Sequence, residues 1–572
     1  MHLTVLLHFD RLDVHLRFLF IPFTFFPMSP VIYETPSLPN SVIYQIYPRS
    51  FRDSNGDGIG DINGIIQGLD YLNDGTEHSL GVDAIWLSPI YKSPMFDFGY
   101  DVSDHCDIDP IFGSIADFDM LVKEAHRRNV KIILDFIPNH TSHLHPWFLE
   151  SRSSKINPKR DWYIWRGGKE ENPPTNWLSR FGGSGWEYDP ITNEYYYHSF
   201  LSEQPDLNWA NPYVQEAMEN VLQFWLDRGV DGFRVDAVEH MIKSSAFQDE
   251  LANDNYRAGA DDPFHSLTHT YTLNQPEIIP ILKSFKKLLS SCPGSFMINE
   301  MNVPLDELIN IYKSTDGICM PFNFHLMHMP WDHTTFKSFI DAFDSAVGKQ
   351  YTPNYVLGNH DTPRLLTRLN EKRARVAAML QLTLRGMPFI YYGDELGLPN
   401  GIIPPEKVRD PWEKKTPGLG LGRDPARTPI VWEDAEFGGF SNVEPWLPFA
   451  DKTRTVLSER QNTSSMFNLY RTLIHARKKF PALLSGDYQP MQIEGKPVLA
   501  FRRIHGGDEA VVVLNFSENE QEIQLDTDIY SVLCTTYLDQ LDQQKKRSQG
   551  SLFLRPHEGY VLTRSQPAML TA

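Results

Sequence analysis

Short apolar runs alternate with helix-like stretches from about Ser41 to residue 480, and this alternation constrains the fold more than any other feature of the chain. Seven runs have the length and composition of buried strands: residues 42–47, 84–87, 131–136, 232–235, 296–299, 355–357 and 389–392. Helices are expected between them, for example over residues 117–128 and over residues 212–227, where Asn211 suits the N-cap and Pro212 the first helical position. Strands and helices alternating over this length predict a parallel sheet.

Acidic residues lie at or just beyond the ends of these predicted strands: Asp135, Asp236, Glu300 and Asp361. In a (β/α)8 barrel the carboxyl ends of the parallel strands surround one mouth, and functional residues lie there. We therefore predict an α/β fold of the TIM-barrel class, with these carboxyl groups gathered at its mouth.

One segment interrupts the alternation. Residues 139–208 are rich in Trp, Tyr, Gly and Pro and show no helical period, so we expect an inserted subdomain (domain B) after the third strand. The barrel (domain A) then comprises residues 39–138 and 209–480.

The pattern of apolar and polar residues changes again after the barrel. Residues 498–502, 509–516 and 521–525 have the pattern of antiparallel strands, and Gly506-Gly507-Asp508 suits a hairpin turn. Residues 481–572 are therefore predicted to form a C-terminal antiparallel β-sandwich (domain C).

The first 38 residues do not fit this architecture. Residues 18–26 carry no charge, but a run of that length falls far short of the ~20 residues that a membrane span needs. Acidic residues stand where a secretory signal has its basic region, and no small-residue cleavage site follows. We therefore expect residues 1–38 to be a disordered extension.

The charge balance argues against several kinds of partner. The chain has 53 Lys and Arg against 73 Asp and Glu, a net charge of −20. Nucleic acids and anionic membranes attract clustered basic residues, so neither is expected as a partner. The four cysteines are scattered without C-x-x-C spacing, which argues against a zinc site or a disulfide framework and favours a reducing, cytoplasmic location.

The acids at the strand ends suit different chemical tasks. Alternation places Arg234 and Asp236 on one face of a strand, where the guanidinium should lower the pKa of Asp236 and keep it ionised, as a nucleophile requires. Glu300 ends an apolar strand, where a drier setting should raise its pKa and suit a general acid. With Asp361 as a third carboxylate that stabilises a cationic sugar, the set describes a retaining glycosidase. The alternative, that each acid is an ion-pair or cap residue, leaves their shared position at strand ends unexplained.

Five short segments, spread along the chain, carry a family signature when they are taken in order. They are Asp-Phe-Ile-Pro-Asn-His at residues 135–140, Gln-Pro-Asp-Leu-Asn at 204–208, Gly-Phe-Arg-Val-Asp at 232–236, Glu300, and Asn-His-Asp at 359–361. The set resembles the signature regions of the α-amylase superfamily, glycoside hydrolase family 13. Residues 204–208, with 44–51 and 422–429, are similar to the branch of α-glucosidases and oligo-1,6-glucosidases. The resemblance covers residues 38–565.

The resemblance implies a role for each matching residue. Asp236 matches the nucleophile that forms a β-glucosyl-enzyme, Glu300 matches the acid/base, and Asp361 matches the stabiliser of the transition state. Tyr100 matches the aromatic platform under the non-reducing glucose, whose C–H face is apolar. The alternative for Tyr100 is a core residue.

Further matches concern the walls of the same pocket. His140, Arg234 and His360 match residues that hold the hydroxyl groups of the glucose. In this branch Asp97 pairs with an arginine of the 422–429 segment, here expected to be Arg427. The pair closes the pocket behind the sugar and makes the enzyme exo-acting. The alternative for Arg427 is a surface ion pair.

Ala237, directly after the matched nucleophile, bears on the linkage. In the resembling family a Val at this position is associated with α-1,6 cleavage, and Ala or Thr with α-1,4 cleavage. A branched side chain would narrow the floor of the pocket and change how the next sugar leaves. Ala237 therefore favours maltose-like substrates, by a margin of only ~1–3 kcal/mol.

The loop at residues 53–61 has acids and amides at alternate positions, which is how a loop wraps a hard cation. It begins like an EF-hand loop, but Gly64 stands where the bidentate Glu is expected. It is similar instead to the first barrel loop of the α-glucosidase branch, where Ca²⁺ or Mg²⁺ is structural. The resemblance implies ligands from Asp53, Asn55, Asp57, the Ile59 carbonyl and Asp61. The alternative is a loop of Asx turns without a metal.

Taken together, these features predict a retaining, exo-acting α-glucosidase for short oligosaccharides, with α-1,4 bonds favoured and some transglycosylation. We expect a monomer or homodimer whose partner is a small oligosaccharide. Three alternatives stay open. The first is an oligo-1,6-glucosidase. The second is a sucrose or trehalose-type isomerase, although residues 367–372 lack the Arg-Leu-Asp-Arg-Asp run of sucrose isomerases. The third is a non-catalytic transporter heavy chain, which would need a membrane helix.

Overall fold

A computed structural model describes residues 40–168, 172–525, 530–539 and 550–564. The predicted extension at residues 1–38 lies outside this described part. Among the described residues, no helix combines the length and apolarity needed to cross a bilayer.

An eight-stranded parallel sheet forms the core, in the order β11-β10-β9-β5-β2-β1-β13-β12. Its strands are β1 (Ile43–Ile46), β2 (Ala84–Leu87), β5 (Lys131–Phe136), β9 (Gly232–Val235), β10 (Phe296–Asn299), β11 (Cys319–Pro321), β12 (Asn354–Val356) and β13 (Met387–Tyr391). At the two ends of this order, the side-chain amide of Asn354 donates to the Pro321 carbonyl at 2.8 Å and accepts from the Asn323 amide at 2.9 Å. The edge strands therefore lie side by side, and the predicted (β/α)8 barrel is confirmed.

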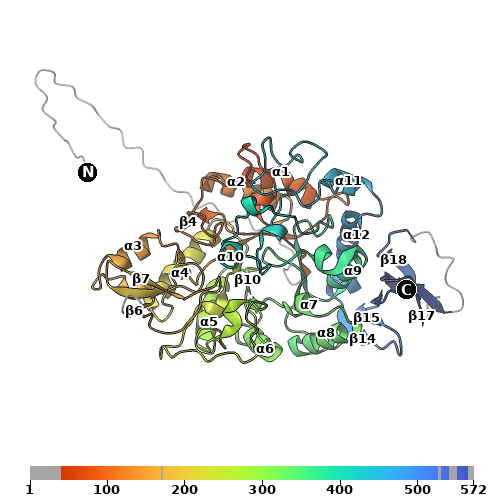
Figure 1. Cartoon of the computed structure of the whole chain (residues 1–572). Helices are drawn as coiled ribbons and strands as arrows, with labels where there is room; N and C mark the ends of the chain where they lie inside the picture. The colour runs from red at the N-terminus through yellow and green to blue at the C-terminus, as the bar shows by residue number, and fades with distance from the viewer. Residues whose placement is uncertain (1–39, 169–171, 526–529, 540–549, 565–572) are drawn as a thin grey trace, which may run out of the picture. The chain divides into compact units, whose positions relative to one another are not determined.

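A helix follows each barrel strand along the chain. These helices are α1 (Ile62–Leu72), α2 (Ile115–Arg127), α4 (Pro212–Leu226), α5 (Ile278–Leu289), α6 (Leu305–Ser314), α8 (His333–Val347), α9 (Leu365–Thr383) and α12 (Met466–Lys479). The predicted cap is present, because the Asn211 side chain accepts from the Tyr213 amide and Pro212 opens α4. Figure 1 shows α9 and α12 next to each other on the outside of the barrel.

Shorter elements complete the barrel loops and its C-terminal edge. They are β3 (Tyr91–Lys92), β4 (Asp104–Ile108), α7 (His325–His328), α10 (Pro411–Lys415), α11 (Val456–Gln461) and α13 (Pro481–Ser485). Sequence patterns missed β11, because a three-residue strand that ends in Pro carries too little periodic signal.

The segment between β5 and α4 contains α3 (Pro146–Ser153) and a small antiparallel sheet, in the order β6-β8-β7. Its strands are β6 (Trp165–Gly167), β7 (Trp186–Asp189) and β8 (Glu194–Tyr197), which lie close to α3 in Figure 1. Buried aromatic side chains, among them Trp177, Trp186 and Tyr197, form its own small core. A bridge between His140 and Asp206 ties the end of this segment to the loop after β5.

The C-terminal part forms two antiparallel sheets, as predicted. The larger has the order β14-β15-β16-β20-β18, and the smaller pairs β17 with β19. The strands are β14 (Asp487–Met491), β15 (Val498–His505), β16 (Asp508–Asn515), β17 (Gln521–Gln524), β18 (Ser531–Thr535), β19 (Ser551–Leu554) and β20 (Gly559–Arg564). His505 pairs with Asp508 across the predicted hairpin turn. The fully buried guanidinium of Arg503 donates to the Thr383 carbonyl at the end of α9.

Candidate active site

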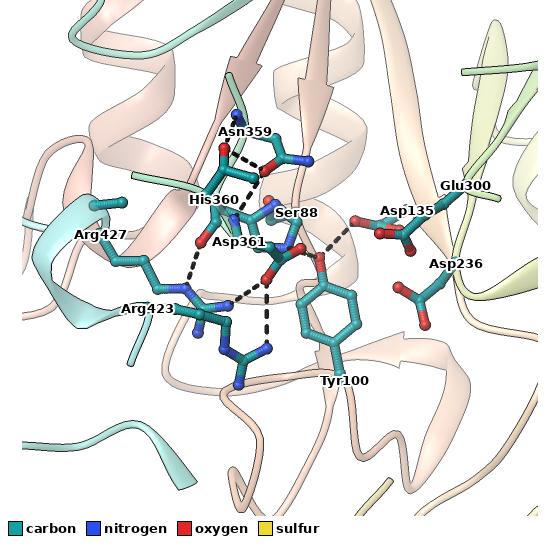
Figure 2. A network of polar contacts seen from close by, with 12 residues as sticks. Ser88, Tyr100, Asp135, Asp236, Glu300, Asn359, His360, Asp361, Arg423 and Arg427 are labelled. Carbon is teal, nitrogen blue, oxygen red and sulfur yellow. Dashed lines mark hydrogen bonds and ion pairs between the residues drawn. The ribbon is translucent and has the colours of Figure 1, made fainter. Parts of the chain in front are cut away.

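The predicted carboxyl groups converge at the carboxyl ends of the barrel strands. Asp236 directly follows β9, Glu300 directly follows β10, Asp361 lies in the loop after β12, and Asp135 lies near the end of β5. Asp236, Glu300 and Asp361 line a pocket of about 310 Å³. Figure 2 shows Asp135, Asp236 and Glu300 on one side of the Tyr100 ring and Asp361 on the other.

Arg234 connects three of these carboxyl groups. Its Nη1 lies 2.6 Å from Asp135 and 2.7 Å from Asp236, and its Nη2 lies 2.5 Å from Glu300. The Arg234 side chain is 1% exposed, so water does not share in these contacts. One positive charge therefore neutralises part of three buried or half-buried negative charges, and the site favours retaining a proton.

The surroundings of Asp236 and Glu300 differ from the sequence-based expectation. Glu300 was expected in the drier setting, but its side chain is 23% exposed and that of Asp236 is 9% exposed. Burial raises the pKa of Asp236, Arg234 opposes this, and the charges of Glu300 and Asp135 raise the pKa further. The expected lowering by Arg234 is therefore present, but burial and the neighbouring acids outweigh it.

Asp361 has the opposite balance of charges. Its Oδ1 lies 2.8 Å from Arg427 Nη2 and 3.4 Å from Arg423 Nη1. Burial alone would raise the pKa of Asp361, but His360, whose Nε2 lies 3.1 Å from Asp361 Oδ2, and then Arg427 and Arg423 outweigh it and hold that pKa below its ordinary value. Asp361 is therefore ionised at neutral pH.

Tyr100 stands between the two groups of carboxylates. Its hydroxyl lies 3.0 Å from Asp135 Oδ2 and 2.5 Å from His360 Nε2, and its ring stacks on His360 with centroids 5.4 Å apart. Burial raises the pKa of Tyr100 and lowers that of His360, so both groups are uncharged at neutral pH. Gln45, 2.8 Å from His360 Nδ1, orients the imidazole ring from behind.

His140 joins the pocket to the 204–208 segment. Its Nε2 lies 3.1 Å from the Tyr100 carbonyl and 3.1 Å from the Gln204 amide nitrogen, and Gln204 also donates to Asp97 at 3.3 Å. Burial lowers the pKa of His140 to about 4, which keeps it neutral. The segment that indicated the α-glucosidase branch thus lies against the residue predicted to hold a sugar hydroxyl.

The expected pairing of Asp97 with Arg427 is wrong. Asp97 pairs with Arg423, whose Nη2 lies 2.7 Å from Asp97 and 2.7 Å from Asp410. The short 3₁₀ turn at Asp424–Ala426 separates the two arginines, and it directs Arg427 to the His360 carbonyl and to Asp361. Arg427 is also fully buried and is not a surface residue.

Twelve residues that line the pocket were not predicted from the sequence. They are Arg180, Phe181, Phe200, Glu239, His240, Asn302, Phe324, Met327, His328, Thr362, Trp412 and Arg423. Arg423 lies within residues 422–429, the segment that resembles the α-glucosidase branch, so the sequence did contain a signal for it. Glu239 accepts from the Asn302 amide at 2.6 Å, and burial raises its pKa to about 7. Nothing in the periodicity or composition distinguishes the remaining residues, because loops bring them together.

Ala237 lies at the floor of the pocket in the left-handed backbone region, with φ of 46°. Its amide donates to Glu300 Oε2 at 3.1 Å, so this conformation positions the Glu300 carboxyl group. A β-branched residue would be strained at this φ. Val at this position would therefore carry a conformational cost of the backbone in addition to its greater bulk.

The predicted cation loop is a chain of Asx turns before α1. Asp53 accepts from the amides of Asn55, Gly56 and Gly58, Asp57 accepts from the Ile59 amide, and Asp61 caps α1 at Gly64. In the described part of the chain, no three His, Cys, Asp or Glu side chains are grouped to hold a metal. Any cation would therefore also need the Asn55 and Ile59 oxygens, which suit Ca²⁺ or Mg²⁺. The cation stays a prediction.

Comparisons with known proteins identify the family. The model of the α-amylase catalytic domain matches residues 45–486. The chain is 39% identical to a probable alpha-glucosidase of Rhizobium meliloti over 84% of this chain and 89% of that protein. It is 36% identical to an oligo-1,6-glucosidase of Parageobacillus thermoglucosidasius over 91% of this chain and 98% of that protein.

Solved structures extend the agreement to the whole fold. The alpha-glucosyl transfer enzyme XgtA superposes with a TM-score of 0.85 at 37% identity, covering 93% of this chain and all of that one. The trehalulose synthase MutB from Pseudomonas mesoacidophila gives 0.80 at 32% identity, also over 93% of this chain and all of that one. The chain therefore belongs to the α-amylase family of glycoside hydrolases, glycoside hydrolase family 13, and is similar over most of its length to α-glucosidases and oligo-1,6-glucosidases.

Proposed function

We propose that this protein is a retaining, exo-acting α-glucosidase that removes terminal glucose from short oligosaccharides and favours α-1,4 bonds. The observation that supports it best is the grouping of Asp236, Glu300 and Asp361 around one pocket whose rear is sealed by an ion pair. Relatives named alpha-glucosidase and oligo-1,6-glucosidase support the substrate class.

In the first step, Asp236 attacks the anomeric carbon. A bond forms between that carbon and a carboxylate oxygen, the bond to the leaving oxygen breaks, and Glu300 gives its proton to that oxygen. The shared guanidinium of Arg234 keeps the two carboxyl groups close together, which favours the short separation of a retaining mechanism.

In the second step, water attacks the glucosyl-enzyme. Glu300, now ionised, takes a proton from the water, and the bond between the anomeric carbon and Asp236 breaks, which restores both groups. An alcohol in place of water would give transglycosylation by the same movements of electrons and protons. The similarity to the alpha-glucosyl transfer enzyme XgtA supports this side reaction.

The remaining side chains would hold the glucose ring. Asp361, kept ionised by its two arginines, stabilises the positive charge that develops on the sugar in the transition state. Tyr100 offers an aromatic face, and the neutral imidazoles of His140 and His360 can bond to hydroxyl groups.

A buried bridge of Asp97, Arg423 and Asp410 supports the exo action. Asp97 and Arg423 line the pocket, so this bridge would block a sugar chain from extending beyond the bound glucose. A neutral sugar substrate also fits an acidic protein, because binding does not depend on attraction between net charges.

Incubation with maltose, isomaltose and sucrose, followed by separation of the products, tests this function. We expect glucose from maltose at the highest rate. The similarity to a trehalulose synthase makes isomerisation the second candidate. A single isomeric disaccharide from sucrose, with little free glucose, would refute the hydrolase proposal in favour of an isomerase.

A further inference from the structure

A hollow of about 570 Å³ is formed by residues of domain B and of the loop that follows β9. We name it the 155–247 groove, because residues between 155 and 166, Glu194, residues 208–210 and residues between 241 and 247 form its walls. None of these wall residues lines the pocket at the barrel mouth. The groove is larger than that pocket of about 310 Å³, so it has room for a molecule of hexose size.

The 155–247 groove is basic, although the chain as a whole has 53 basic and 73 acidic residues. Its charged lining residues are Lys155, Arg160, Arg166 and Lys243 on the basic side and Asp161 and Glu194 on the acidic side. The side chain of Lys243 is 1% exposed and forms an ion pair with Asp206, which lies outside the lining. The groove therefore keeps a surplus of positive charge even when Asp206 is counted with it.

The two acidic side chains of the groove already accept bonds from the protein. Glu194 accepts from Arg160 and lies 3.1 Å from Lys155 Nζ. Asp161 accepts from the side-chain amide of Asn208 at 3.1 Å and from that of Asn211 at 3.4 Å. The groove therefore offers a ligand more donors than acceptors, which favours a ligand that brings its own acceptor oxygens.

Arg166 supplies a donor whose position is fixed before a ligand arrives. Its guanidinium carbon lies 3.5 Å from the centroid of the Phe247 ring, and its Nη1 donates to the Trp165 carbonyl at 2.7 Å. The aromatic ring covers one face of the guanidinium, whereas the N–H groups at its edge lie in the guanidinium plane and can bind an anion. Within the described ranges, no Asp or Glu forms an ion pair with Arg166.

We propose that the 155–247 groove binds a phosphate group at Arg166, either as inorganic phosphate or as the phosphate ester of a hexose. A phosphate ester carries about −1.5 to −2 charges at pH 7 and three terminal oxygens that accept hydrogen bonds. A planar guanidinium can donate to two of these oxygens at once. The volume of the groove leaves room for a sugar beside the phosphate. This binding site goes beyond the proposed α-glucosidase function and does not depend on it.

Titration calorimetry on the full chain tests the proposal with inorganic phosphate and with glucose 6-phosphate, each in a chloride buffer of matched ionic strength. We expect both phosphates to bind at concentrations at which added chloride gives no signal. Tighter binding of glucose 6-phosphate would identify a sugar ester as the ligand, and equal binding would identify the phosphate group alone. Absence of binding by both phosphates would overturn the proposal.

A variant of the groove makes the test specific. Arg166→Gln removes the charge and the planar fork, and should raise the Kd for both phosphates by at least about tenfold. Arg52→Gln is the matched control, because Arg52 also lies over an aromatic ring, that of Trp432 at 5.2 Å, but outside the groove. It should leave the Kd unchanged. Equal losses in R166Q and R52Q would show a response to net charge alone and would overturn the site.

A second variant covers the case in which R166Q does not fold. Ser245 is exposed and lines the groove, so Ser245→Glu adds a negative charge there without removing a contact of Arg166. It should also raise the Kd for phosphate by at least about tenfold. If both variants bind phosphate as tightly as the unmodified protein, the groove is not the site and the proposal is wrong.

Rates of maltose hydrolysis separate this site from the pocket at the barrel mouth. R166Q and S245E should hydrolyse maltose as the unmodified protein does, because neither residue lines that pocket. Phosphate that competes with maltose and is still bound by R166Q would lie in the pocket, which would overturn the groove proposal. A protein that binds phosphate in the groove but hydrolyses no glucoside would refute the proposed function alone.

Discussion

Two groups of carboxylates border the pocket, and they differ in their supply of positive charge. Around Arg234, three carboxyl groups share one guanidinium: Asp135, Asp236 and Glu300. Around Asp361, two guanidinium groups, Arg423 and Arg427, approach one carboxylate. The two groups lie on either side of Tyr100 in Figure 2.

The difference shows how one pocket can hold acids with opposite tasks. Where three carboxyl groups share the single guanidinium of Arg234, burial and mutual repulsion favour keeping one proton within the group. Where Arg427 and Arg423 both approach Asp361, that carboxylate stays ionised and can stabilise a cationic sugar, although Arg423 is also shared with Asp97 and Asp410. The number of guanidinium groups that reach a carboxyl group therefore separates a group that holds a proton from a carboxylate that stays ionised.

The largest effect is expected from removing the nucleophile of the Arg234 group. Asp236→Asn should lower kcat/KM for maltose by about a thousandfold or more, because an amide cannot form the glucosyl-enzyme. Initial rates of glucose release measure this. Asp119→Asn, at a half-exposed surface ion pair, is the matched control and should retain full activity. An active D236N enzyme that folds normally would contradict the assignment.

The acid of the same group should respond to the leaving group. Glu300→Gln is expected to lower kcat/KM for maltose by about 10²–10⁴-fold, since the leaving oxygen loses its proton donor. A 4-nitrophenyl α-glucoside should be much less affected, because nitrophenolate departs without protonation. Comparing the two substrates measures the role directly. Equal losses on both would show that Glu300 is not the general acid.

The Asp361 group is expected to lose stability when one arginine is removed. Arg423→Met leaves Asp97 and Asp410 without their shared partner and should cost about 3 kcal/mol of the free energy of unfolding, measured with denaturant. Arg373→Met removes a surface ion pair and is the control, with less than about 1 kcal/mol expected.

The same variant has a signature in pH. The pKa of Asp361 in the folded protein lies below its unfolded value, so its contribution to stability is present above the unfolded pKa and is lost as the pH falls through the folded one. Removing Arg423 raises the folded pKa. As the pH falls below the unfolded pKa, the free energy of unfolding should therefore decrease less in R423M than in the unmodified protein, measured with denaturant at a series of pH values. An equal decrease in both proteins would show that Arg423 does not set the ionisation of Asp361.

A smaller effect on activity is expected from Ala237, which lines the pocket. Ala237→Val adds two methyl groups beside Glu300 and strains the left-handed backbone at this residue. The ratio of isomaltose to maltose hydrolysis should rise by about tenfold. Ala237→Ser, which is smaller than Val and not β-branched, should change the ratio much less. A ratio unchanged in A237V would show that this residue does not select the linkage.

The smallest effect is expected on thermal stability. It concerns the acidic loop at residues 53–61, whose side chains accept hydrogen bonds from backbone amides. If a cation binds there, EDTA should lower the melting temperature by a few degrees, and Ca²⁺ or Mg²⁺ should restore it. Asp57→Asn should weaken this response, whereas Asp74→Asn, in another exposed Asx turn, should not. A melting temperature that changes with neither the chelator nor the cation would favour a loop of Asx turns without a metal.

Much of the barrel follows from local patterns. Four of the predicted strands match β2, β5, β9 and β10 residue for residue, because short, mostly apolar runs mark strands of a parallel sheet that is buried on both faces. The convergence of Asp236, Glu300 and Asp361 also follows, since the ends of parallel strands meet at one mouth. Strand β11 did not follow, because its three residues, the last of them Pro, carry too little periodic signal.

The sequence by itself determined the fold class, the family resemblance and the positions of the acids, since each depends on residue order within short segments. Only the tertiary structure decided which arginine faces Asp97 and how many arginines surround each carboxylate. The physical reason is that side-chain pairing and burial depend on distances between loops. A pKa or an ion pair follows those distances, and no local pattern encodes them.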